Sequence, residues 1–256
     1  MTTPVDLWWV DLAAIDGPPD LLDAAERHRI ARLRESGGDY RTFAASRIAL
    51  RVLLGVYLGR DPATLQFEQP AAGKPNIEGA AGLRYSLSRS GSKTLIAIAR
   101  DLDFGIDLER IRSLPELDSI ARDILTPKAH DRFRRHRGSD RLDIFFSAWT
   151  AYEAVSKAEG RPLADARPID WGTDGAAAAP TVMERRGRRW WLYPLALPGR
   201  YYGHLAAARA AEIRRFTFPA GGDTRTTRIA ALLGESDIGV GGDAGDRQNR
   251  HMGTPR

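Results

Sequence analysis

The sequence of 256 residues contains no cysteine. This absence excludes a disulfide framework, a thiolate nucleophile, an iron–sulfur cluster and a cysteine-ligated zinc site. The histidines do not supply a zinc site either, because no HExxH pattern or similar ligand spacing occurs. The five histidines are His28, His130, His136, His204 and His251. We therefore predict neither a zinc site nor a catalytic histidine.

Long apolar runs are also missing from the sequence. No stretch reaches the ~18 apolar residues of a membrane span, and the first residues lack the basic start and apolar core of a secretory signal. Hydrophobic residues make up 43% of the chain and charged residues 28%, which is typical of globular domains. We expect a folded, soluble, cytoplasmic protein with no membrane partner.

Lysine is scarce, although the chain carries 38 basic residues against 33 acidic ones and a formal net charge of +5. Only Lys74, Lys93, Lys128 and Lys157 are lysines, and the other basic residues are arginines. Such a strong bias toward arginine indicates a drift in composition, so the positive charge by itself is weak support for nucleic-acid binding. A P-loop nucleotide site is excluded as well, because the pattern GxxxxGK[ST] is absent.

Helical and extended patterns are mixed without regular alternation, which favours an α+β fold over a parallel α/β sheet. Helices are predicted over 20–37, 39–58 (starting at an Asp cap), 117–137 and 142–158. Strands are predicted at 94–99 and 104–111 as a hairpin, and on both sides of Pro198-Gly199. Residues 217–256 are rich in glycine, and we expect them to form a flexible tail whose one helix is the short apolar patch 229–233.

Two carboxylates share one face of the strand FGIDLERI. Strict alternation places Asp107 and Glu109 on the same side as Gly105, which leaves room for a close neighbour. Adjacent carboxylates repel one another unless a cation, a proton or an arginine lies between them. A magnesium site would provide that cation, since Mg²⁺ prefers hard oxygen ligands. A solvated strand face is the alternative at this point.

A second group of candidates follows one line of the helix in FFSAWTAYEAVSKAEG. Trp149, Glu153 and Lys157 are spaced four residues apart, so their side chains are neighbours. One interpretation is an exposed Glu–Lys ion pair. The tryptophan on the same line favours a partly buried face, where a glutamate beside a lysine suits a metal ligand or a base with a phosphate-binding partner.

The third group comprises the loop GKPN and the segment SLSRSG that follows it. Ser86, Ser88 and Ser90 alternate and share one face if the segment is extended. Together with Lys74 and Arg89, these hydroxyls form the ingredients of an anion site. A serine-rich turn with incidental basic residues remains the alternative.

The order GKPN, SLSRSG, FGIDLER and WTAYEAVSKAEG resembles the surfactin-type 4'-phosphopantetheinyl transferases. The upstream helix YRTFAASRIALRVLLGVYLG is also similar to that family, so the resemblance covers about residues 26–208. It implies a monomeric pseudo-twofold pair of similar α+β halves, 1–100 and 101–216, with the active site at their interface.

The resemblance also implies an activity, that of a phosphopantetheinyl transferase of the holo-[acyl-carrier-protein] synthase type. Such an enzyme moves the 4'-phosphopantetheine arm of coenzyme A to a serine of an acyl or peptidyl carrier protein. It serves polyketide or nonribosomal-peptide synthesis, uses Mg²⁺ and releases adenosine 3',5'-bisphosphate. The resemblance assigns the metal to Asp107, Glu109 and Glu153, and catalysis to Glu153, Lys157 and Asp107. It assigns coenzyme A binding to Arg41, Thr42, Lys74, Ser88, Arg89 and Lys157.

Two positions depart from the family pattern. Arg89 stands where the family usually has histidine, and Tyr152 stands where lysine often precedes the glutamate. An arginine still grips a phosphate, bidentately and at any pH. The basic stretch 128–141 is a candidate docking surface for an acidic carrier protein, with a solvated basic helix as the alternative.

Two other functions compete with transfer. The segment ERRGRRWW joins arginines to Trp190 and Trp191, and basic and aromatic groups together bind single-stranded nucleic acid. The buried-strand interpretation, with one tryptophan ring in the core, is the alternative for this segment. The other competing function is a relative that binds coenzyme A or a carrier protein without catalysis.

Overall fold

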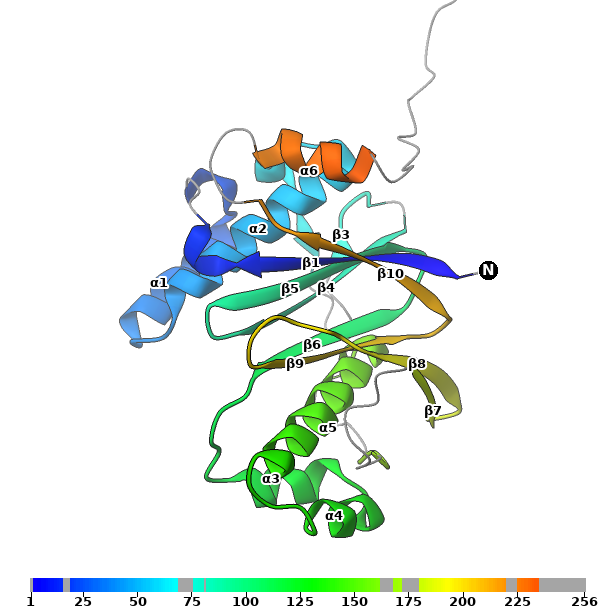
Figure 1. Ribbon diagram of the computed structural model, residues 1–256. Coiled ribbons are helices and arrows are strands. Elements are labelled where there is room, and N and C mark those ends of the chain that lie inside the picture. Colours follow the sequence, from blue (N-terminus) through cyan, green and yellow to red (C-terminus); the bar gives the residue numbers. More distant parts are fainter. Residues whose placement is uncertain are drawn as a thin grey trace, which may run out of the picture.

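The computed structural model describes residues 2–15, 19–68, 76–80, 82–161, 168–171, 180–219 and 225–234. Its helices are α1 (Ala24–Glu35), α2 (Tyr40–Leu58), α3 (Leu117–Ile124), α4 (Pro127–Phe133), α5 (Gly138–Glu159) and α6 (Arg225–Gly234) (Figure 1). The first strands are β1 (Thr3–Asp11), β2 (Phe67–Glu68), β3 (Asn76–Ile77), β4 (Leu83–Ser90) and β5 (Lys93–Arg100). The later strands are β6 (Phe104–Arg110), β7 (Thr181–Arg185), β8 (Arg188–Pro194), β9 (Tyr201–Ala207) and β10 (Ala211–Thr217).

The protein has the predicted α+β fold, and its helices and sheets are arranged in four layers. One sheet has the strand order β10-β1-β5-β4 and the other β6-β9-β8-β7, and β2 and β3 form a small separate pair. One core lies between the first sheet and α2, a second lies between the two sheets, and a third lies between the second sheet and α5. Figure 1 shows the helices of these layers on opposite sides of the sheets.

Local sequence signals explain how the two long helices are bounded. Asp39 caps α2 by accepting a hydrogen bond from the Thr42 N–H, and the helix ends at Gly59, whose φ of 61° lies in the left-handed region. Gly160 ends α5 in the same way, with a φ of 67°. The predicted helices 39–58 and 142–158 are therefore confirmed, and α5 begins four residues earlier than expected.

The helical stretch predicted over 117–137 is divided into α3 and α4. Thr126 caps α4 by accepting a hydrogen bond from the Ala129 N–H, and Pro127 occupies the first helical position. Because proline has no N–H to continue a preceding helix, the chain breaks there and starts a new one.

The predicted hairpin between the strands at 94–99 and 104–111 is wrong. β5 is an interior strand with β1 on one side and β4 on the other, so it has no free edge for β6. β6 pairs instead with β9 of the second sheet, in the antiparallel register Asp107↔His204. The chain therefore passes from the first sheet to the second between β5 and β6. The second sheet thus contains β6, which we call the acidic strand because it carries Asp107 and Glu109.

The C-terminal part of the described chain returns to the first sheet. β10 pairs in parallel with β1, and α6 packs Ile229 and Leu233 into the core beneath α2. The short helix predicted at 229–233 is thus confirmed and spans 225–234, and its burial packs this part of the predicted tail onto the folded body. Residues 235–256 lie outside the described residues.

The connectivity of the two halves repeats. In the first half, β1 is followed by the long helix α2 and by the hairpin β4–β5, and β1 pairs with β5. In the second half, β6 is followed by the long helix α5 and by the hairpin β8–β9, and β6 pairs with β9. This repeat supports the predicted pseudo-twofold relation, which stays a prediction. No helix of the described part is long and apolar enough to cross a membrane.

Candidate active site

A glycine brings α5 against the acidic strand. A Cβ atom at Gly105 would lie 2.4 Å from the Ala154 carbonyl oxygen and 2.5 Å from the Ala158 nitrogen. Only a glycine permits this approach, because real Cβ atoms do not come that close to backbone atoms. The close packing places the face of β6 that carries Asp107 directly beside the line of α5 that carries Lys157.

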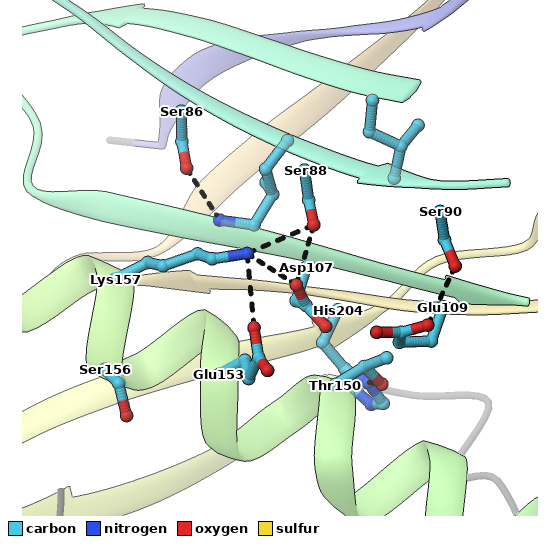
Figure 2. Close-up of polar contacts among 12 residues, drawn as sticks. Ser86, Ser88, Ser90, Asp107, Glu109, Thr150, Glu153, Ser156, Lys157 and His204 are labelled. Atoms are coloured by element: carbon cyan, nitrogen blue, oxygen red, sulfur yellow. Dashed lines mark hydrogen bonds and ion pairs between the residues drawn. The ribbon is translucent and has the colours of Figure 1, made fainter. Parts of the chain in front are cut away.

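Asp107 and Lys157 form the centre of the site (Figure 2). Lys157 Nζ lies 2.5 Å from Asp107 Oδ1 and 3.1 Å from Ser88 Oγ, and the Ser88 hydroxyl donates to Asp107 Oδ1 at 2.7 Å. Asp107 is only 2% exposed, so the interpretation of this strand face as solvated is wrong. Asp107 Oδ2 is buried and has no hydrogen-bond partner among the described residues.

Glu153 lies on the other side of the lysine. Lys157 Nζ is 3.4 Å from Glu153 Oε2, so the expected i,i+4 ion pair exists, but on a largely buried face. Burial, and then the negative charge of Asp107, raise the pKa of Glu153 to about 8, although Lys157 opposes the shift. Such a carboxyl can exchange a proton near neutral pH, as a general base must.

The ammonium group of Lys157 stays charged in this position. Burial alone would lower the pKa of Lys157, but the charges of Asp107 and Glu153 outweigh burial and raise it above its ordinary value. The site therefore holds a fixed positive charge at the junction of β4, β6 and α5. A phosphate would find a charge-assisted donor there.

Glu109 shares the face of β6 with Asp107, as predicted, but points to other partners. Its Oε2 accepts hydrogen bonds from the Ser90 hydroxyl at 2.8 Å and from Arg112 at 2.9 Å. In the described part of the chain, no three acidic or histidine side chains are grouped closely enough to hold a metal ion. The donor set itself suits Mg²⁺, because carboxylates are hard ligands and Asp107 Oδ2 is an unsatisfied buried oxygen.

A second group of predicted residues lies around the N-terminus of α2. Arg41 stacks on Tyr40 with 5.8 Å between its guanidinium carbon and the ring centroid, and the Thr42 hydroxyl donates to Asp39 at 2.5 Å. Arg89 lies near Phe43, on the face of β4 opposite to Ser88. Arg41 and Thr42 line a groove of about 660 Å³ between α1, α2 and the end of β1.

The two groups meet at the turn between β4 and β5. Ser92, in this turn, lines the groove, and Ser90, two residues earlier, contacts Glu109. The structure therefore brings four predicted residues into contact, with Glu109 beside them: Ser88, Asp107, Glu153 and Lys157. The predicted residues at the N-terminus of α2 lie in the neighbouring groove. Lys74 lies outside the described residues.

Tyr152, which departs from the family pattern, faces the core and not the acidic site. Its ring is buried, and the Arg185 guanidinium lies 5.4 Å from the ring centroid. An arginine from β7 therefore contacts the residue that stands where the family often has lysine.

A buried pair that no sequence pattern indicated lies beneath the site. His204 is the cross-strand partner of Asp107, and its Nδ1 lies 2.8 Å from the Thr150 hydroxyl on α5. Burial lowers the pKa of His204 to about 3, so this ring is neutral at physiological pH. Only the pairing of β6 with β9 could have revealed it, because His204 is far from Asp107 in the sequence.

The basic and aromatic segment does not offer stacking rings for nucleic acid. Trp190 is fully buried against α5, and Trp191, its neighbour on β8, is half-buried. The interpretation of this segment as a strand with one ring in the core is therefore confirmed, and the nucleic-acid alternative loses its main support.

Comparison with known proteins gives a consistent result. Residues 103–196 match the family described as the 4'-phosphopantetheinyl transferase superfamily. The 4'-phosphopantetheinyl transferase HetI of Nostoc sp. is 35% identical over 133 residues, which cover 51% of this chain and 56% of that protein. The 4'-phosphopantetheinyl transferase AcpT of Salmonella typhimurium is 32% identical over 116 residues, 45% of this chain and 59% of AcpT.

A third relative extends the match over more of this chain. The L-aminoadipate-semialdehyde dehydrogenase-phosphopantetheinyl transferase of Eremothecium gossypii is 28% identical over 177 residues, which cover 67% of this chain and 63% of that protein. The chain thus spans 56 to 63% of the length of these three curated relatives.

Proposed function

We propose that this chain, whose residues 103–196 match the 4'-phosphopantetheinyl transferase superfamily, transfers the 4'-phosphopantetheine arm of coenzyme A to a serine of an acyl or peptidyl carrier protein. The observation that supports this most directly is the position of Lys157 between Asp107 and Glu153, at the junction of the two sheets. A fixed cation beside two carboxylates suits a pyrophosphate substrate. The proposal includes the surfactin-type subclass, holo-[acyl-carrier-protein] synthase chemistry, a monomer and a cytoplasmic location.

The transfer forms one bond and breaks one. The carrier serine oxygen attacks the phosphorus attached to the pantetheine, and the bond from that phosphorus to the bridging pyrophosphate oxygen breaks. The bond electrons leave with adenosine 3',5'-bisphosphate. Glu153, which lies 3.4 Å from Lys157 Nζ, takes the serine proton. Lys157 stabilises the negative charge that develops on the phosphate oxygens.

Asp107, Glu109 and Glu153 would hold a magnesium ion in this proposal. When bound, Mg²⁺ would neutralise charge on the pyrophosphate as a Lewis acid. Asp107 would offer Oδ2, the oxygen without a partner among the described residues, while Oδ1 keeps its contacts with Ser88 and Lys157.

Coenzyme A would extend from the acidic site to the groove beside α2. Its pyrophosphate would lie near Lys157, and the predicted coenzyme-binding residues Arg41 and Thr42 line the groove. Arg89 would contribute positive charge from the opposite face of β4, and Lys74 stays a predicted contact. The β4–β5 turn, where Ser90 and Ser92 lie, would connect the two binding regions.

The proposal is tested by carrier-dependent release of adenosine 3',5'-bisphosphate. The protein is incubated with coenzyme A, Mg²⁺ and an apo carrier protein, and the nucleotide is quantified by chromatography. We expect release in proportion to the carrier, and none with a carrier whose acceptor serine is replaced by alanine. Binding of coenzyme A without release would instead favour the non-catalytic relative.

We also infer that the carrier partner is acidic and contacts α4 and the first turn of α5. Arg134 and Arg135 are exposed in this region. The double substitution Arg134→Glu with Arg135→Glu should raise KM for the carrier about tenfold by slowing association, with little change in coenzyme A binding. The matched control is Arg189→Glu with Arg200→Glu, which changes the net charge equally at two other exposed sites. An equal rise in both double variants, or an unchanged KM, would remove this docking surface.

A further inference from the structure

The two sheets meet at their edge strands through side chains. β4 ends one sheet and β6 ends the other, and the two strands belong to different sheets although they lie side by side (Figure 2). Ser86, Ser88 and Ser90 project from alternate positions of β4 toward β6, and all three are buried. We call these three residues the serine ladder.

The hydroxyls of the serine ladder replace the carbonyl groups of a normal strand pair. The Ile106 N–H donates to Ser86 Oγ at 3.1 Å, and the Arg110 N–H donates to Ser90 Oγ at 3.0 Å. Both are backbone donors of the edge strand β6, which would otherwise be unsatisfied in a buried position. The outer members of the ladder therefore hold β6 in register with β4.

The direction of the Ser90 hydroxyl is determined by its partners. Because Ser90 Oγ accepts from the Arg110 N–H, its single proton is free to be donated, and Glu109 Oε2 receives it at 2.8 Å. Ser88 is oriented by similar logic, since the Lys157 ammonium group can only donate and Asp107 Oδ1 must receive the serine proton. Each carboxylate of the acidic strand thus has one serine donor.

Glu109 depends on Ser90 more than Asp107 depends on Ser88. The other partner of Glu109 Oε2 is Arg112, whose side chain is 46% exposed, whereas Ser90 is 9% exposed. An ion pair with an exposed arginine fixes geometry weakly, because solvent competes and the long side chain is mobile. The buried serine is therefore the contact that defines where the Glu109 carboxylate lies.

We propose that Ser90 is a positioning residue that orients Glu109 for a divalent cation. The inference rests on the proposed function, in that it takes Glu109 as a metal ligand. A hydrogen-bonded carboxylate presents its remaining oxygen in a fixed direction, and loss of such an outer contact typically lowers metal affinity by about 10- to 100-fold. Ser86 has no such role, because its hydroxyl accepts from the Ile106 N–H and is not bonded to a carboxylate of the described residues.

The test is direct titration of the full-length protein with Mg²⁺ by calorimetry, without coenzyme A or carrier. Ser90→Ala should raise the Kd for Mg²⁺ about tenfold or more. Ser90→Thr keeps the hydroxyl and should titrate like the wild type. Ser86→Ala is the matched control: it removes an equally buried hydroxyl of the same strand, and with it the acceptor for one backbone N–H of β6, so it should lower the thermal midpoint and leave the Kd unchanged. If Ser90→Ala does not fold, Ser90→Cys replaces it, because a thiol of similar shape is a weak donor.

The outcomes separate this inference from the proposed function. A wild-type Kd in Ser90→Ala, or the same shift in Ser86→Ala, overturns the positioning role even if the wild type modifies a carrier. A wild type that binds no Mg²⁺ overturns it as well. A shifted Kd in Ser90→Ala alone, in a protein that releases no adenosine 3',5'-bisphosphate, supports the positioning role and rejects the proposed transfer.

Discussion

The substitution Asp107→Asn should reduce kcat/KM for carrier modification by about 10²- to 10³-fold, the range found when one preorganised electrostatic group is removed. Asparagine keeps the shape of the side chain but removes the charge that faces Lys157 at 2.5 Å. It also removes the oxygen that is buried without a partner among the described residues and that we propose as a magnesium ligand. The rate is measured with saturating coenzyme A while the carrier concentration is varied.

Asp103→Asn provides the matched control for this loss. Asp103 precedes the same strand, but its side chain is half exposed and pairs with the equally exposed Arg188. Surface pairs of this kind contribute little, so the control should retain the wild-type rate. Comparable rates for Asp107→Asn and the wild type would show that the cluster around Lys157 is not the catalytic site.

The substitution Gly105→Ala should destabilise the protein by about 3 kcal/mol or more, the upper range for overpacking. The added methyl group would meet backbone atoms of Ala154 and Ala158, which cannot move aside as a flexible side chain can. α5 would have to shift away from β6, and Lys157 would shift with it. We therefore expect a lower free energy of unfolding in urea together with a lower transfer rate.

Gly234→Ala tests whether the effect is specific to this contact. Gly234 is the last residue of α6, and a Cβ atom there would meet nothing within 4 Å. This variant should unfold at the wild-type urea concentration. If Gly105→Ala also unfolds at the wild-type urea concentration, α5 and β6 are not packed as closely as the site requires.

The sequence predicted which side chains share one face of a strand or helix better than it predicted which other elements those side chains contact. Alternation along β6 correctly paired Asp107 with Glu109, and the helical period correctly aligned Glu153 with Lys157. Both patterns are local, so they depend only on the conformation of a few consecutive residues. That Ser88 and Lys157 meet Asp107 required the tertiary fold, because β4, β6 and α5 are brought together by packing between layers.

The incorrect parts of the prediction concern long-range pairing. No pattern in the strand 94–99 indicates that β1 and β4 occupy both of its edges, so the short connection to β6 predicts a hairpin that the structure does not contain. The place of His204 is likewise a product of long-range pairing, since only the β6–β9 register puts it beside Asp107. Sequence patterns predict which side chains lie on one face of a strand. Which strand pairs with it depends on the strand edges that remain free in the folded sheet.

The most direct test of the account is the intact mass of an apo carrier protein after incubation with this protein, coenzyme A and Mg²⁺. We predict a mass gain of one phosphopantetheine group, located on a serine by peptide analysis, with a greatly slowed gain for Asp107→Asn. A carrier whose mass stays unchanged with wild-type protein, across acyl and peptidyl carriers, would contradict the proposed activity. A gain at equal rates with wild type and Asp107→Asn would contradict the proposed site.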